Sequence, residues 1–151
     1  MHELHSFTLR GDTIEAGAAS GMPVLLPKPL SFWGGYDAAA GCIIEAAHPN
    51  AGQSLAGAVM LMAAAKGSSS SSSVLAEAIR AGTGPAAIVM RERDLIIALG
   101  VIVARELYGM AVPLVVVDEA AWQTLAACRS RIHIAASDKG AATISFSPDS
   151  P

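Results

Sequence analysis

The first half of the chain contains short apolar stretches separated by glycine and proline, a pattern typical of β-strands. Residues 63–67 separate the last of these stretches from a series of serines. We predict four strands from this pattern, at residues 6–9, 23–26, 41–44 and 58–62.

The second half alternates between helical and strand patterns. Asp94 and Asp118 each precede a helical stretch, where a carboxylate can accept hydrogen bonds from the first backbone N–H groups. Gly109 is placed to end the first of these two helices. The predicted order is helix 74–80, strand 86–90, helix 95–107, strand 113–117, helix 119–128 and an edge or barrel strand at 131–134.

This alternation of strands and helices implies right-handed crossovers and a parallel sheet layer. Together with the β-rich first half, it predicts an α/β fold of β-barrel or three-layer type. We expect a single compact domain over residues 1–151, with its core at about 10–135 and a frayed C-terminal segment at 145–151.

Composition narrows the class of protein. The chain has 151 residues, 52% of them hydrophobic and 15% charged, which argues against disorder and favours one globular domain. The net charge is -3 and no basic stripe is present, so we expect no nucleic-acid partner. No apolar run reaches the ~18 residues of a membrane span, and no signal-peptide pattern precedes the first strand. Cys42 and Cys128 form neither a metal-ligand pattern nor a disulfide framework. We therefore expect a cytoplasmic protein without membrane association.

The segment 66–73 reads Lys-Gly followed by six serines, between an apolar run and a predicted helix. Serine runs are often linkers, but this one is short and lies between two apolar segments. We interpret it as a tight loop that leads into the first turn of a helix, where backbone N–H groups and hydroxyls can bind an anion. A plain serine-rich turn is the alternative. The order of residues does not match a nucleotide P-loop.

A second segment of interest places two aromatic residues beside paired glycines: Ser31, Phe32, Trp33, Gly34 and Gly35. It predicts either a turn with a hydrophobic plug or a loop wall that lines a ligand or subunit contact. His48 lies in a polar connection and is a turn or surface residue, or else part of the same pocket. The charged residues 91–94 are expected to form a solvated loop and a helix cap.

Taken in order, these segments resemble the swivel domain of aconitase X. The resemblance rests on Leu-Ser-Phe-Trp-Gly-Gly-x-Asp at 30–37, His-Pro-x-x-Gly-x-Ser at 48–54, the Gly-Ser run with its Val-Leu-Ala-Glu continuation at 67–77, and the Ala-Leu-Gly and Glu-Leu-Tyr-Gly motifs at 98–100 and 106–109. It covers roughly residues 10–135. It implies a swivelling β/β/α fold, similar to the aconitase swivel domain.

The resemblance also implies an activity and a partner. The chain would be the small subunit of a hydro-lyase that dehydrates a small hydroxy acid, with cis-3-hydroxy-L-proline as the expected substrate. Mevalonate 5-phosphate is the alternative substrate, and a non-catalytic anion-binding module is the alternative function. The iron–sulfur cluster or iron would lie on a large aconitase X-type subunit, with no cofactor on this chain, which we expect to be inactive alone.

The resemblance assigns roles to individual residues. Ser68 aligns with the serine that acts as proton acceptor in the phosphomevalonate branch of the family. The resemblance also implies that Gly67, Ser69 and Ser70 bind the substrate. Serines stand here where the related aconitase loop has an arginine, so backbone N–H groups, serine hydroxyls or the partner subunit would bind the carboxylate. Ser31, Phe32, Trp33, Gly34, Gly35 and His48 are the candidate pocket or interface residues. Lys66 is either a cation that stabilises the Ser68 alkoxide or a solvated loop lysine.

Overall fold

Four parallel strands form the centre of the computed structural model, which describes residues 7–138 and 140–147. They are β3 (Pro23–Leu26), β6 (Val59–Met62), β7 (Ala87–Met90) and β8 (Leu114–Val116), hydrogen-bonded in the order β8-β7-β6-β3. Every residue of β6 and β7 is buried. Strands buried on both faces read as continuous apolar runs, which is why the sequence identified them.

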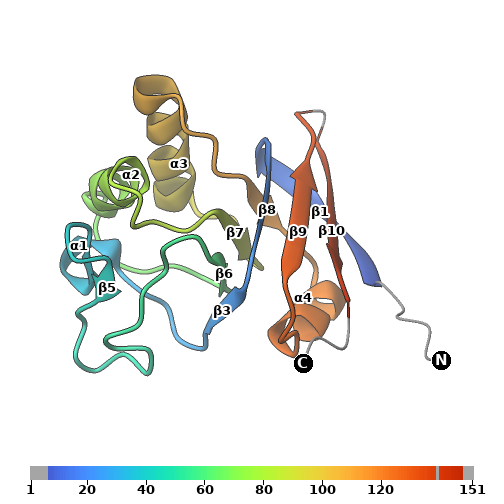
Figure 1. The fold of residues 1–151 in the computed structure, drawn as a ribbon, viewed down its shortest axis with the longest axis horizontal. Coiled ribbons are helices and arrows are strands. Elements are labelled where there is room, and N and C mark those ends of the chain that lie inside the picture. The colour runs from blue at the N-terminus through green and yellow to red at the C-terminus, as the bar shows by residue number, and fades with distance from the viewer. Residues whose placement is uncertain (1–6, 139, 148–151) are drawn as a thin grey trace.

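Four antiparallel strands continue the same sheet beyond β8. They are β1 (Phe7–Glu15), β10 (Ala141–Phe146), β9 (Ile132–Ala136) and β2 (Gly17–Gly21), and the complete order is β2-β9-β10-β1-β8-β7-β6-β3. Met22 joins the two end strands β2 and β3, and its carbonyl oxygen accepts a hydrogen bond from Val59 N at 2.9 Å. The sheet therefore curves into a near-barrel (Figure 1).

Three helices cover this sheet: α2 (Ser71–Arg80), α3 (Leu95–Tyr108) and α4 (Glu119–Ala126). One apolar core lies between α2, α3 and one face of the parallel strands, through residues such as Met60 and Ile88. A second core lies on the other face, between Val59, Val89, α4 and the antiparallel strands. The result is a layer of helices, a layer of parallel strands and a layer of antiparallel strands (Figure 1). A short turn of helix, α1 (Phe32–Gly35), and a two-stranded ribbon of β4 (Tyr36–Asp37) and β5 (Cys42–Ile43) complete the fold.

The predicted caps of α3 and α4 are confirmed, although α4 ends at Ala126, two residues before its predicted end. Asp94 Oδ1 accepts a hydrogen bond from Ile97 N at 2.9 Å, and Asp118 Oδ1 accepts one from Ala121 N at 2.9 Å. Gly109 ends α3 in the left-handed conformation, with φ +64°. The helix predicted at 74–80, α2, begins at Ser71, three residues earlier than predicted. Ser71 and Ser72 are buried, so the buried face of the helix includes part of the serine run.

Three strands, β2, β4 and β10, were not predicted, and the prediction that the C-terminal segment frays was wrong for residues 145 and 146. β2 and β10 both contain many small residues and depend on pairing with β9. Ser145 and Phe146 were expected to fray but pair with β1 and β9, and the Phe146 ring stacks on Phe7 at 5.5 Å. The remainder of that predicted segment, from residue 148 on, lies outside the described residues. No helix within the described residues is long and apolar enough to cross a membrane.

Candidate functional site

The candidate site lies at the carboxyl ends of the parallel strands. Because β3, β6, β7 and β8 are parallel, the loops that follow them leave from one edge of the sheet. Backbone hydrogen bonds join two of these loops, from Arg91 N and Glu92 N to the carbonyl oxygen of Ala63 at 3.1 and 3.0 Å. Ligands of open α/β sheets bind at this edge, and both segments singled out in the sequence lie on it.

The serine loop (residues 63–70) connects β6 to α2. Ser68, Ser69 and Ser70 are exposed, whereas Ser71 and Ser72 are buried, with 2% and 8% of their surface accessible. Ser68 Oγ accepts a hydrogen bond from Ser70 N at 3.2 Å. The Ser68 hydroxyl is thus exposed to solvent and held against a backbone donor immediately before the helix.

The free backbone donors of this loop are not those expected from the sequence. The N–H groups of Ser71, Ser72 and Ser73, in the first helical turn, donate to the carbonyl oxygens three residues earlier, at 3.0 to 3.2 Å. Within the described residues, the N–H groups of Ser68 and Ser69 have no acceptor. An anion would therefore be bound by these two amides and by nearby hydroxyls, one turn before the helix itself.

The second segment lies directly against the serine loop (Figure 1). Trp33 N donates to Ser71 Oγ at 3.0 Å, and Ser31 Oγ lies 3.3 Å from the same atom. Gly67 has φ +104°, and a Cβ there would be 2.0 Å from Ser31 Oγ, so only glycine allows this approach. The two segments therefore lie on one side of the domain.

The two aromatic residues of this segment have opposite environments. Phe32 is fully buried, and its ring centroid lies 5.6 Å from that of Tyr36. Trp33 is 57% exposed. Gly34 has φ +76° with open space around it, whereas Gly35 is buried and its carbonyl oxygen accepts from Ile44 N at 2.8 Å. Phe32 is therefore the hydrophobic plug, and Trp33 is left at the rim of the site.

His48 is a buried turn residue and not a surface one. Its Nδ1 accepts a hydrogen bond from Asn50 N at 3.0 Å, so Nε2 carries the proton and donates to the carbonyl oxygen of Lys28 at 2.9 Å. Only 5% of the residue is exposed. Since both ring nitrogens are used, His48 supports the loop after β3 and offers no nitrogen to a ligand.

The charged side chains of this edge are paired. Lys66 Nζ lies 3.0 Å from Glu45 Oε2, which offsets its charge beside Ser68. Arg91 is 2.7 Å from Glu119, and Arg93 is 3.7 Å from Asp12. Hydrogen bonds from Gln123 and then Arg91 lower the pKa of the Glu119 carboxyl, which keeps it ionised. The charged residues 91–94 are thus the solvated loop and cap that the sequence predicted.

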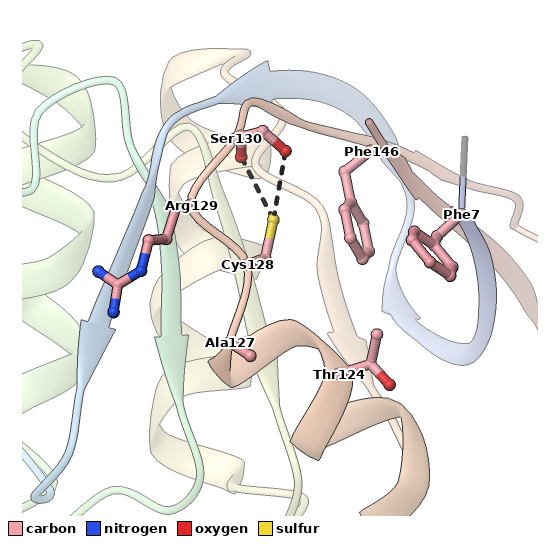
Figure 2. Close-up of a pocket in the computed structure, with 7 residues that line it drawn as sticks. All are labelled: Phe7, Thr124, Ala127, Cys128, Arg129, Ser130 and Phe146. Atoms are coloured by element: carbon pink, nitrogen blue, oxygen red, sulfur yellow. Dashed lines mark hydrogen bonds between the residues drawn. The ribbon is translucent and has the colours of Figure 1, made fainter. Parts of the chain in front are cut away.

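A pocket lies elsewhere in the molecule. Figure 2 shows a pocket of about 290 Å³ on the α4 side of the sheet, next to the stacked Phe7 and Phe146 rings and the Cys128 thiol. This is the opposite side of the sheet from α1 and α2 (Figure 1). The serine loop, by contrast, is an open rim. In residues 7–138 and 140–147, no group of three His, Cys, Asp or Glu side chains could hold a metal ion.

Known proteins share this fold and its motifs. Residues 8–144 match the family model of the aconitase X swivel domain. The chain is 41% identical over 136 residues to cis-3-hydroxy-L-proline dehydratase of Pseudomonas aeruginosa, a match that covers 85% of this chain and 23% of that protein. It is 38% identical over 96 residues to the phosphomevalonate dehydratase small subunit of Thermococcus gammatolerans, covering 64% of this chain and 73% of that subunit. The crystal structure of Thermococcus kodakaraensis aconitase X (holo-form) matches with a TM-score of 0.75 and 29% identity, covering 91% of this chain and 97% of that one.

These matches confirm the fold and the family that the motifs indicated. The chain spans less than a quarter of the Pseudomonas dehydratase but most of the archaeal small subunit. The same unit is thus similar to part of a long chain in one relative and to a separate subunit in another.

The environments of Phe32 and Trp33 lead to a prediction about stability. Phe32→Ala should lower the free energy of unfolding by about 3–5 kcal/mol, because it removes a fully buried ring. Trp33→Ala should change it by less than about 1 kcal/mol, as at other exposed positions. Urea unfolding of the free chain measures both. A loss of similar size for the two variants would show that Trp33 belongs to the core.

Proposed function

Because the chain belongs to the aconitase X swivel-domain family, we propose that it supplies the serine base of a hydro-lyase that dehydrates a small hydroxy acid. One observation carries this proposal. Ser68 follows Gly67 directly, its hydroxyl is exposed, and Ser70 N–H points at its oxygen from 3.2 Å. That geometry suits a hydroxyl that must become an alkoxide at the edge of a site.

The proposed chemistry is removal of a proton next to a carboxylate, with loss of the β-hydroxyl. A serine is a poor base near neutral pH, so the site must stabilise its alkoxide. The Ser70 N–H and the positive end of the α2 dipole do so from within this chain. Lys66 contributes less than a bare cation would, since its charge is offset by Glu45.

Substrate binding is proposed to use the backbone of the same loop. The N–H groups of Ser68 and Ser69 have no acceptor within the described residues and lie beside exposed hydroxyls. They can donate to a carboxylate in place of an arginine. The same donors would also serve a non-catalytic anion-binding module, which is the second candidate function.

The first proposed substrate is cis-3-hydroxy-L-proline. The match to the Pseudomonas dehydratase covers 85% of this chain at 41% identity, whereas the match to the archaeal small subunit covers 64% at 38%. Mevalonate 5-phosphate is therefore the alternative. The chain covers only 23% of the Pseudomonas protein, so most of that enzyme has no counterpart here.

We propose that a large aconitase X-type subunit supplies the rest of the site. The archaeal relative is a small subunit by name, which supports a heteromer. Exposed apolar side chains at the same edge of the sheet also support it, since Trp33 is 57% and Leu95, at the start of α3, is 80% exposed. Aromatic side chains such as that of Trp33 are enriched at protein–protein interfaces. We propose that the enzyme works in the cytoplasm and is inactive without its large subunit.

The serine base is tested in the assembled enzyme. Ser68→Ala should abolish turnover while leaving folding and assembly intact, because it removes only an exposed hydroxyl. Ser73→Ala, an exposed serine of the same run, is the matched control. The reconstituted pair is assayed on both substrates. Turnover of Ser68→Ala within a few-fold of wild type would refute the base, and a stable ligand-binding monomer without any activity would favour the binding module.

A second prediction concerns the partner surface. Trp33→Ala should weaken association with the large subunit, because an exposed aromatic ring in the centre of a contact provides much of its binding energy. Leu107→Ala, an exposed residue at the far end of α3, is the control. Analytical ultracentrifugation or calorimetry measures the dissociation constant. Equal affinity for Trp33→Ala and wild type would place the interface elsewhere.

A third prediction concerns the metal. The described residues do not fit an iron site, so no step is assigned to a metal on this chain, and we propose that the iron–sulfur cluster or iron lies on the large subunit. Anaerobic reconstitution of the free chain followed by metal analysis should find no stoichiometric iron. A cluster bound to this chain alone would contradict the proposal.

A further inference from the structure

Two serine hydroxyls, that of buried Ser71 and that of half-buried Ser31, connect the two loops of the candidate site. Ser71 Oγ accepts a hydrogen bond from Trp33 N at 3.0 Å and lies 3.3 Å from Ser31 Oγ. Ser31 Oγ donates to the carbonyl oxygen of Trp33 at 2.9 Å. Together the two hydroxyls contact both polar backbone groups of Trp33.

The direction of each proton follows from these contacts. A serine hydroxyl has one proton to donate, and Ser31 gives its proton to the Trp33 carbonyl oxygen. Ser71 must therefore be the donor in its contact with Ser31. The Trp33 N–H therefore donates to the Ser71 hydroxyl, the Ser71 hydroxyl donates to Ser31, and the Ser31 hydroxyl donates to the Trp33 carbonyl oxygen. This ring of hydrogen bonds, called here the serine ring, is closed, and its members strengthen one another.

The serine ring is joined to the proposed base through the backbone. Ser71 N donates to the carbonyl oxygen of Ser68 at 3.0 Å. On the other side of the loop, Gly67 packs so closely on Ser31 that a Cβ would lie 2.0 Å from its hydroxyl. Ser71 thus contacts Ser68 through its own backbone N–H and contacts Trp33 through its own hydroxyl.

We propose that Ser71 is a positioning residue for the reaction, with Ser31 completing its hydrogen-bonding ring, an inference that rests on the function proposed above for Ser68. The ring fixes Ser68 relative to the Trp33 rim. Ser71 is 2% exposed while Ser73 is exposed, so the serines that follow Ser68 are not equivalent.

The first measurement uses the assembled enzyme at saturating concentration of the large subunit. Ser71→Ala should lower kcat roughly ten- to hundredfold, because displacement of a catalytic group by about 1 Å costs this much. KM should change less than kcat, because the Ser69 N–H and the neighbouring exposed hydroxyls still contact the substrate. Ser73→Ala should keep a kcat close to that of wild type.

The second measurement uses the full chain without its partner. Amide hydrogen exchange by NMR reports directly on Trp33 N–H, which donates to Ser71 Oγ. Exchange at Trp33 should become faster in Ser71→Ala and in Ser31→Ala and stay unchanged in Ser73→Ala. If Ser71→Ala does not fold, Ser31→Ala tests the serine ring in its place, because it removes the other hydroxyl. The double variant should lower kcat no further than the more severe single one, because either change already opens the ring.

The outcomes separate this inference from the proposed function. Equal kcat values for Ser71→Ala and Ser73→Ala would overturn the positioning role, and unchanged exchange at Trp33 would overturn the serine ring. If Ser68→Ala keeps its turnover, the proposed function fails and the positioning role fails with it. The exchange experiment on the free chain would still decide whether the ring exists.

Discussion

The burial of β6 and β7 on both faces is the constraint on which the rest of the structure depends. Their alternate residues enter two different cores, so each strand needs a packed layer on either side. Parallel strands cannot be joined by a hairpin, and the chain must leave β6 at its carboxyl end and return through α2. The serine loop is therefore fixed at the edge where the loops after β3 and β7 also emerge.

This edge of the sheet provides only some of the groups that the proposed reaction needs. Ser68 is exposed, Lys66 is paired with Glu45, and the donors that remain are backbone amides. An alkoxide needs preorganised donors and exclusion of water. The chain supplies donors on a rigid base, but its rim is open, with Trp33 projecting from it. A second surface that closes over the rim would supply what is missing, which supports the proposal of a catalytic partner subunit.

The sequence predicted those parts whose signals are local. Buried apolar runs and aspartate caps identified the parallel strands and α3, and the ordered motifs identified the family. β2 and β10 could not be recognised, because these segments of small residues form strands by pairing with β9 and, for β10, also with β1. Burial of His48 depends on a carbonyl group 20 residues away. The sequence contains one signal for the role of Ser71. This residue precedes Leu75 by four positions, so it lies on the same buried face of α2, toward the N-terminus.

Hydrogen–deuterium exchange of the chain, with and without the large subunit, tests the central claim most directly, since it shows which backbone amides the partner covers. Backbone exchange in residues 31–35 and 66–71 should become slower when the subunit binds. The segment 127–130, which lines the hollow on the other side of the sheet, should be unaffected. Protection confined to 127–130, with no change in the serine loop, would contradict the claim that this loop is half of a shared active site.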